Sequence, residues 1–72
     1  MRAIQFFLDN GDRLRSRCTC TVTKLFVRIN GVYTDRTATY FFRSSDERRL
    51  ILRALRDADV LVYLDTTESI EQ

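Results

Sequence analysis

The chain has 72 residues, of which 44% are hydrophobic and 31% charged, with no proline, no histidine and a net charge of +2. This composition is typical of one small globular domain and excludes a disordered chain. The longest apolar run, residues 60–64, is too short to cross a membrane, and no signal-peptide hydrophobic region follows Met1. We therefore expect a cytoplasmic protein with a single domain over residues 1–65.

Charge is distributed unevenly along the chain. Residues 1–43 carry eight basic and three acidic side chains, a net of +5, whereas residues 44–72 carry four basic and seven acidic ones, a net of −3. Eleven of the twelve basic residues are arginine. Arginine forms bidentate contacts with phosphates and carboxylates, but a GC-rich genome would produce the same bias, so composition alone leaves both explanations open.

The first predicted element is a strand over residues 2–8, in which Ile4, Phe6 and Leu8 alternate on one face. The cluster of turn-forming residues at 9–12 follows. To keep the apolar residues on one face, we expect a loop of three or five residues here, with Gly11 in a left-handed conformation.

A long hairpin, formed by residues 13–29 and 32–43, is the centre of the predicted fold. Asn30-Gly31 lies between β-branched and aromatic runs and predicts a type I′ turn, because both central residues of that turn need positive φ. The apolar alternation of the first strand changes phase near Thr23-Lys24, which predicts a β-bulge there. With that bulge, the apolar side chains of both strands face one side of the sheet.

A helix is predicted from Ser44, the N-cap, to about Ala58. Glu47 stands three residues after Ser44 and completes a capping box, and apolar residues recur at helical spacing through the segment. Residues 60–64 predict a fourth strand covered on both faces, which a right-handed crossover would place parallel to the first strand. The polar, acidic residues 66–72 predict a frayed tail.

These elements predict an α+β fold, a small two-layer sandwich. A three-stranded antiparallel sheet is backed by one helix and followed by a short fourth strand, in the order βββαβ. A sheet this small has exposed edges, which a chain can hide by pairing with a second copy. A homodimer through a sheet edge or face is therefore an additional expectation.

The sequence gives little support for catalysis. It has no histidine to act as a general base, and neither glycine nor any serine lies in a phosphate-binding or nucleophile motif. Cys18 and Cys20 are two apart on one predicted strand, which indicates two small buried core residues; a four-thiolate zinc site shared across a dimer is the alternative. We predict no enzyme activity, no cofactor and no metal site within one chain.

The open face of the predicted sheet carries the candidate binding residues. Arg13, Arg15 and Arg17 alternate along one predicted strand at about 6.6 Å, close to the separation of phosphates in a nucleic acid. Arginines interleaved with exposed aromatics suit single-stranded nucleic acid, and they also suit a protein hot spot. The other predicted partner-binding residues, all from the hairpin, are Phe26, Arg28, Tyr33, Phe41 and Arg43.

The predicted function is that of a non-enzymatic binding module that engages nucleic acid or a protein complex that handles it. A short, arginine-rich, single-domain chain without catalytic residues looks like a small accessory protein of a phage or mobile element. The alternative is a protein-binding inhibitor or adaptor that acts on a host or competitor complex without touching nucleic acid. A third interpretation is that the arginines only solubilise an exposed strand and protect a sheet edge.

Overall fold

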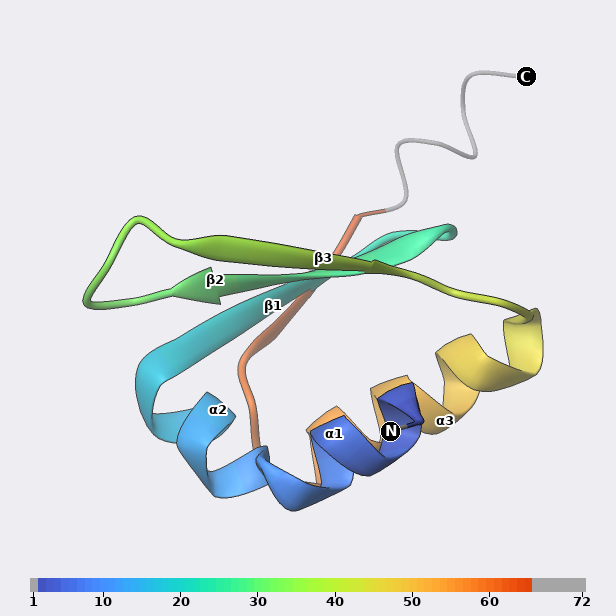
Figure 1. The fold of residues 1–72 in the computed structure, drawn as a ribbon, viewed down its shortest axis with the longest axis horizontal. Helices are drawn as coiled ribbons and strands as arrows, with labels where there is room; N and C mark the ends of the chain where they lie inside the picture. The colour runs from blue at the N-terminus through green and yellow to red at the C-terminus, as the bar shows by residue number, and fades with distance from the viewer. Residues whose placement is uncertain (1, 66–72) are drawn as a thin grey trace.

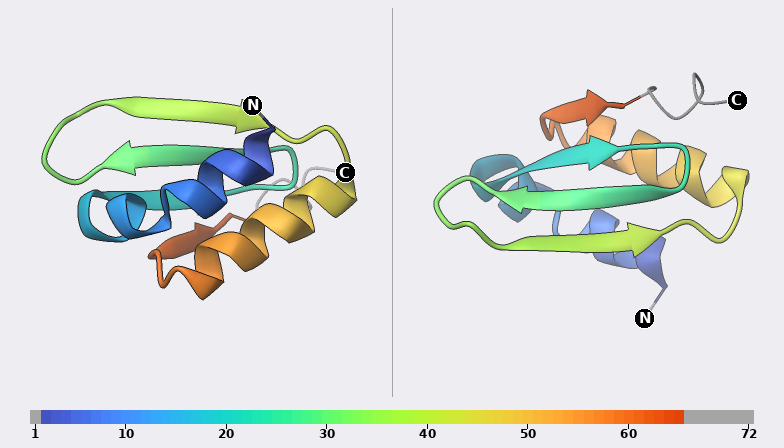
Figure 2. Two further views of the ribbon diagram at one scale, coloured as in Figure 1. Left: turned by 60° about the horizontal axis from the view of Figure 1, so that its bottom comes forward. Right: turned by 90° about the horizontal axis from the view of Figure 1, so that it is seen from above.

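A computed structural model describes residues 2–65 of the protein as a mixed four-stranded sheet with helices on one face, and the other face open (Figures 1 and 2). The strand order is β3-β2-β1-β4; β4 is parallel to β1 and the other neighbouring pairs are antiparallel. No helix within residues 2–65 has the length and apolar composition needed to cross a membrane. The elements are α1 (Ala3–Asp9), α2 (Gly11–Arg17), β1 (Cys18–Val22), β2 (Phe26–Gly31), β3 (Thr37–Phe41), α3 (Ser45–Asp57) and β4 (Val62–Leu64).

The α+β class is confirmed, but the βββαβ order is only partly right because the N-terminal segment is helical. The strand expected over residues 2–8 is α1, and the first part of the expected long strand is α2. Phe7 and Leu14 are the buried hydrophobic residues of this segment, whereas Leu8 is 58% exposed. A short apolar run can satisfy both helical and strand spacing, and packing of α1 against α3 decides between them.

Gly11, between α1 and α2, is required for close packing. No glycine in residues 2–65 has a positive φ, so the left-handed conformation expected for Gly11 is wrong. A Cβ added to Gly11 would lie 2.7 Å from the Cβ of Ala58, which follows α3. The missing side chain therefore allows the start of α2 to contact the end of α3.

The first hairpin turns at residues 23–25, where the sequence predicted a bulge. Thr23 is 2% exposed, and its Oγ1 accepts hydrogen bonds from the backbone N–H groups of Leu25 (3.1 Å) and Phe26 (3.0 Å). Arg48 of α3 donates from Nε to the carbonyl oxygen of Thr23 at 3.0 Å. The change of phase in the apolar pattern therefore marks a hairpin turn between β1 and β2, and the expected β-bulge within one strand is wrong.

The type I′ turn expected at Asn30-Gly31 is wrong, because both residues belong to β2. The chain turns in the following residues, 32–36, and the Gly31 N–H donates to the Arg36 carbonyl oxygen at 3.0 Å. A Cβ on Gly31 would lie 2.5 Å from Thr34 Oγ1. Here too the glycine permits a close approach of the chain to itself.

The predicted helix is confirmed as α3, with Ser44 as its N-cap. Its buried face meets the inner side chains of the sheet. The last strand, β4, is parallel to β1, which belongs to the expected second strand; the pairing expected with residues 2–8 is wrong, because that segment is α1. The frayed tail expected over residues 66–72 lies outside the described residues. The buried core consists of Phe7, Leu14, Cys20, Val22, Val27, Ile51, Ala54, Leu55 and Val60.

We expect Thr23→Val to lower the free energy of unfolding by about 1–3 kcal/mol, because two partly buried N–H groups lose their acceptor with little change in side-chain volume. Chemical denaturation measures the change. Thr23→Ser keeps the oxygen and serves as the control, with a smaller expected loss. A Thr23→Val protein as stable as the unaltered one would contradict the assigned role of this hydroxyl.

Candidate functional site

The sheet face opposite the helices is the candidate site (Figure 2). Alternate residues of each strand point away from the core, and the strand register brings them together. Among these described strand residues none is acidic. We call this set the open face; it consists of Thr19, Thr21, Phe26, Arg28, Asn30, Thr37, Thr39, Phe41 and Tyr63.

An aromatic pair with an adjacent arginine forms one end of the open face. Phe26 and Phe41 are directly paired across β2 and β3, with ring centroids 5.4 Å apart and planes at 64°. The guanidinium carbon of Arg28 lies 5.3 Å from the centroid of the Phe26 ring, within the range of a cation–π contact. Phe41 is 63% exposed, so much of its ring is accessible to a partner.

Polar side chains and one tyrosine continue the open face across the sheet. Arg28 is in register with Thr39 on one side and Thr21 on the other, and Tyr63 of β4 lies beside Thr21. Asn30 Nδ2 donates to Thr21 Oγ1 at 3.2 Å. The sequence predicted a fourth strand covered on both faces, and this is wrong, since Tyr63 is 55% exposed. Because that prediction left no exposed face on the fourth strand, Tyr63 was not among the predicted binding residues.

The predicted row of three arginines does not exist. Arg13, Arg15 and Arg17 lie on α2, where residues two apart point to different sides of the helix. All three are exposed, and Arg15 forms an ion pair with Asp12 at 3.4 Å. Since α2 belongs to the helical layer, these arginines are not part of the open face.

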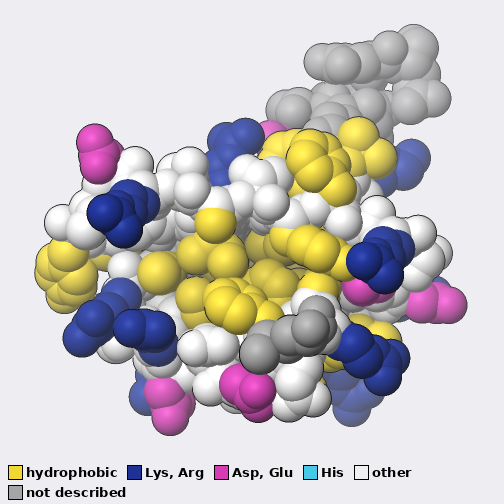
Figure 3. All heavy atoms as spheres, in the orientation of Figure 1, with side chains coloured by type: hydrophobic (Ala, Val, Ile, Leu, Met, Phe, Trp, Pro, Cys, Tyr) yellow, Lys and Arg dark blue, Asp and Glu magenta, His cyan; other side chains and the backbone are white. Residues whose placement is uncertain are grey.

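The remaining predicted residues divide between two places. Phe26, Arg28 and Phe41 lie together on the open face, whereas Tyr33 is in the loop of residues 32–36 and is 80% exposed. Arg43 follows β3 and lines a cleft of about 920 Å³ between α1, β3 and the start of α3, which we call the edge cleft. Hydrophobic side chains gather between the sheet and the helices on this side of the molecule (Figure 3).

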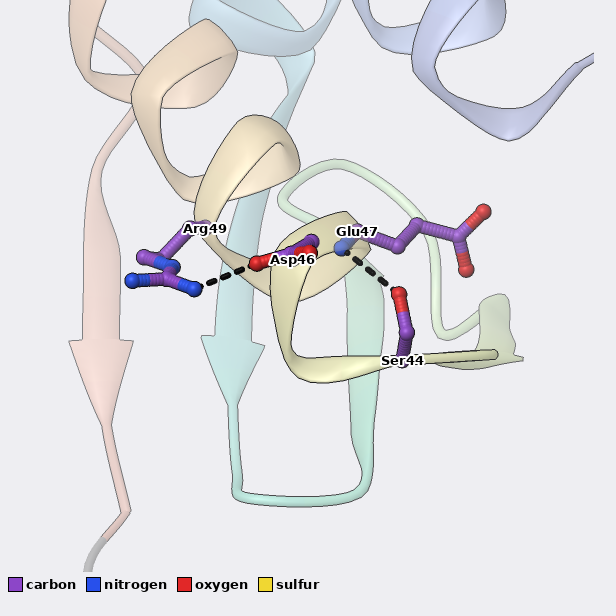
Figure 4. Close-up of polar contacts among 4 residues, drawn as sticks. All are labelled: Ser44, Asp46, Glu47 and Arg49. Atoms are coloured by element: carbon purple, nitrogen blue, oxygen red, sulfur yellow. Dashed lines mark hydrogen bonds and ion pairs between the residues drawn. The ribbon is translucent and has the colours of Figure 1, made fainter.

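The first turn of α3 holds Arg43 and Tyr40 in place at the edge cleft. The Glu47 carboxylate accepts hydrogen bonds from the Arg43 backbone N–H at 2.8 Å and from the Tyr40 hydroxyl at 2.9 Å. Ser44 Oγ accepts from the Glu47 N–H, and Asp46 pairs with Arg49 on the same turn (Figure 4). The hydrogen bond from the Arg43 backbone is the largest cause that lowers the pKa of Glu47, and burial opposes it.

The two cysteines belong to the packed interior. Cys20 is fully buried, and Cys18 packs against the core. Burial, with a smaller effect of Cys18, raises the pKa of the Cys20 thiol to about 11, so its thiolate is disfavoured at neutral pH. Residues 2–65 contain no group of three or more His, Cys, Asp or Glu side chains placed to hold a metal ion.

Comparisons with known proteins found no match: no family model, no curated protein and no solved structure resembles the chain at the level required. The functional evidence is therefore the geometry of the open face and of the edge cleft.

We expect Glu47→Gln to destabilise the protein in a pH-dependent way. Because the pKa of Glu47 lies below its ordinary value of 4.5 in the fold, ionised Glu47 stabilises the protein above that pH, and the contribution is lost as the pH falls through the lowered pKa. The melting temperature of the variant should be lower than that of the unaltered protein at about pH 7, with the gap closing as the pH falls below 4.5 through the lowered pKa.

Asp12→Asn is the matched control, because that side chain is 94% exposed. Circular dichroism at a series of pH values provides the melting temperatures. A gap for Glu47→Gln that stays constant over the whole pH range would contradict this role of the carboxylate.

Proposed function

We propose that the protein is a non-catalytic binding module whose open face engages single-stranded nucleic acid. The observation that carries the proposal is the exposed pair of Phe26 and Phe41, with Arg28 against the Phe26 ring. Bases of a single strand stack on aromatic rings, whereas the bases of a duplex are already stacked on one another. The open face therefore suits a single strand better than a duplex.

The polar residues of the open face support the same partner. Threonine hydroxyls and the Asn30 amide can exchange hydrogen bonds with base edges, and Arg28 can meet a phosphate or a base. All these groups stand on strands, so their positions are fixed by the sheet and little ordering is needed on binding.

Cations around the open face are few, which sets the expected dependence on salt. Arg28 lies on the open face, Lys24 is in the first hairpin turn, and Arg36 is at the end of the loop before β3. If two or three of these meet phosphates, raising salt from about 50 mM to about 200 mM should weaken binding by about 7- to 20-fold.

Fluorescence anisotropy with a short labelled single strand and a matched duplex, at both salt concentrations, tests this expectation. Tighter, salt-dependent binding of the single strand is the predicted result. No salt-dependent binding at micromolar protein would remove nucleic acid as the direct partner. The open face would then be left to a protein partner, since tyrosine and arginine are also enriched in protein hot spots.

We further expect Phe41→Ala to weaken single-strand binding by about 5- to 150-fold, the loss that corresponds to one base stacked on an aromatic ring at about 1–3 kcal/mol. Arg28→Ala should weaken binding and also reduce its salt dependence. Melting curves establish that each variant remains folded.

Two control variants match these changes away from the open face. Leu8→Ala removes an exposed apolar side chain of α1, and Arg53→Ala removes an exposed cation of α3. Both should bind as the unaltered protein does. A loss in the controls equal to the loss in Phe41→Ala would show that the open face is not the binding surface.

A further inference from the structure

β3 is an edge strand with backbone groups directed outward. The Phe42 N–H donates to the Leu25 carbonyl oxygen at 2.9 Å, and the Gly31 N–H donates to the Arg36 carbonyl oxygen at 3.0 Å. Hydrogen-bonded residues alternate along an antiparallel strand, so residues 36, 38, 40 and 42 direct their backbone groups to β2. The residues between them, Thr37, Thr39 and Phe41, direct theirs away from the sheet.

This edge lacks the features with which proteins usually protect one. β3, of sequence TATYF, contains no charged residue and no proline, and it runs for five residues, whereas β4 at the opposite edge has three. Charged edge residues, proline and very short edge strands are the usual means of preventing strand addition. β3 therefore presents a regular, unprotected edge.

The helical layer extends beyond this edge and leaves the edge cleft uncovered. Seen from above the sheet, the start of α1 lies outside β3 (Figure 2), and the cleft between them exposes hydrophobic side chains (Figure 3). Ala38 faces the helices yet is exposed, and Leu50, which lines the cleft, is 53% exposed. One more strand beside β3 would cover both.

We propose that β3 of a second copy occupies this place, antiparallel to the first and related to it by a two-fold axis at Thr39. In this register Thr39 pairs with Thr39 of the second copy, and Thr37 pairs with Phe41 of the second copy. Every outward N–H and C=O of the three residues then has a partner, as an isologous contact requires.

Charge complementarity favours the antiparallel orientation and a second copy as the occupant. Asp35 lies in the bend before β3 and Arg43 in the bend after it, so antiparallel pairing brings Asp35 of one copy to the same end of the joined strands as Arg43 of the other, twice by symmetry. Ala38 and Tyr40 of the second copy would lie over the edge cleft and cover its apolar floor.

This inference does not depend on the proposed function. The dimer leaves the open face of both copies exposed and joins the two sheets into one. A failure to bind nucleic acid would not affect it, because its tests involve only the protein itself.

Sedimentation equilibrium tests the dimer directly. We expect a mass twice the 8.5 kDa of one chain for the unaltered protein. Thr39→Pro should give a single-chain mass with an unchanged circular dichroism spectrum, since it removes an outward N–H without removing a bond to β2. A single-chain mass for the unaltered protein at high micromolar concentration, or a folded Thr39→Pro protein that still dimerises, would overturn the proposal.

Cysteine cross-linking tests the register without requiring the dimer to be broken. In Thr39→Cys the two Cα atoms would be about 5.5 Å apart, within disulfide range. In Thr37→Cys, on the same strand and face, the two Cα atoms would be about 14 Å apart. Mild oxidation should link Thr39→Cys into a dimer and leave Thr37→Cys unlinked; equal linking of the two variants would overturn the register.

Discussion

The helices pack on the sheet through a small core in which Ile51, Leu55 and Val27 are fully buried. With 72 residues, the chain buries one face of its sheet, and the described residues leave the other face uncovered. A small domain has a high ratio of surface to volume, so a large part of its sheet remains exposed. The two surfaces discussed above, the open face and the β3 edge, both follow from this constraint.

These two surfaces differ in the interactions that they offer. The open face presents rings, hydroxyls and a guanidinium group, the kinds of groups with which proteins stack on bases and bind phosphates. The β3 edge presents backbone groups above an apolar floor, which recognise another strand through its main chain and its alternate side chains. Phe41 belongs to both surfaces, since its ring lies on the open face and its backbone N–H and C=O groups point away from β2. In a dimer the two aromatic pairs would lie on the same face of one continuous sheet.

Sequence reasoning predicted the second half of the fold well. The N-cap at Ser44 with Glu47 three residues later and the inward phase of Tyr40 depend on local signals that the packing does not oppose. Phe26, Arg28 and Phe41 were correctly assigned to one face because strand alternation alone determines it. Their use as a binding surface stays a prediction.

The N-terminal half could not be predicted in the same way. The alternation of arginines around Leu14 favours a strand, but burial of Leu14 and Phe7 against α3 and the sheet requires helices there. Asn30-Gly31 carries a strong turn signal, yet both residues belong to β2 and the chain turns at residues 32–36. The other turn forms at Thr23, whose buried hydroxyl has no distinctive sequence pattern. Because Arg13, Arg15 and Arg17 lie on α2 and not on a strand, they do not form the predicted row. The candidate site is consequently smaller than the predicted one and has a larger share of aromatic residues.

Binding of a single strand by the open face is tested most directly by a map of backbone amide shifts by NMR during titration with a short single strand. We expect the largest changes at Phe26, Arg28 and Phe41 of the sheet, with little change at Arg53 of α3. Changes confined to the helices, or no change anywhere in the chain, would contradict the assignment of the uncovered sheet face as the surface that binds nucleic acid.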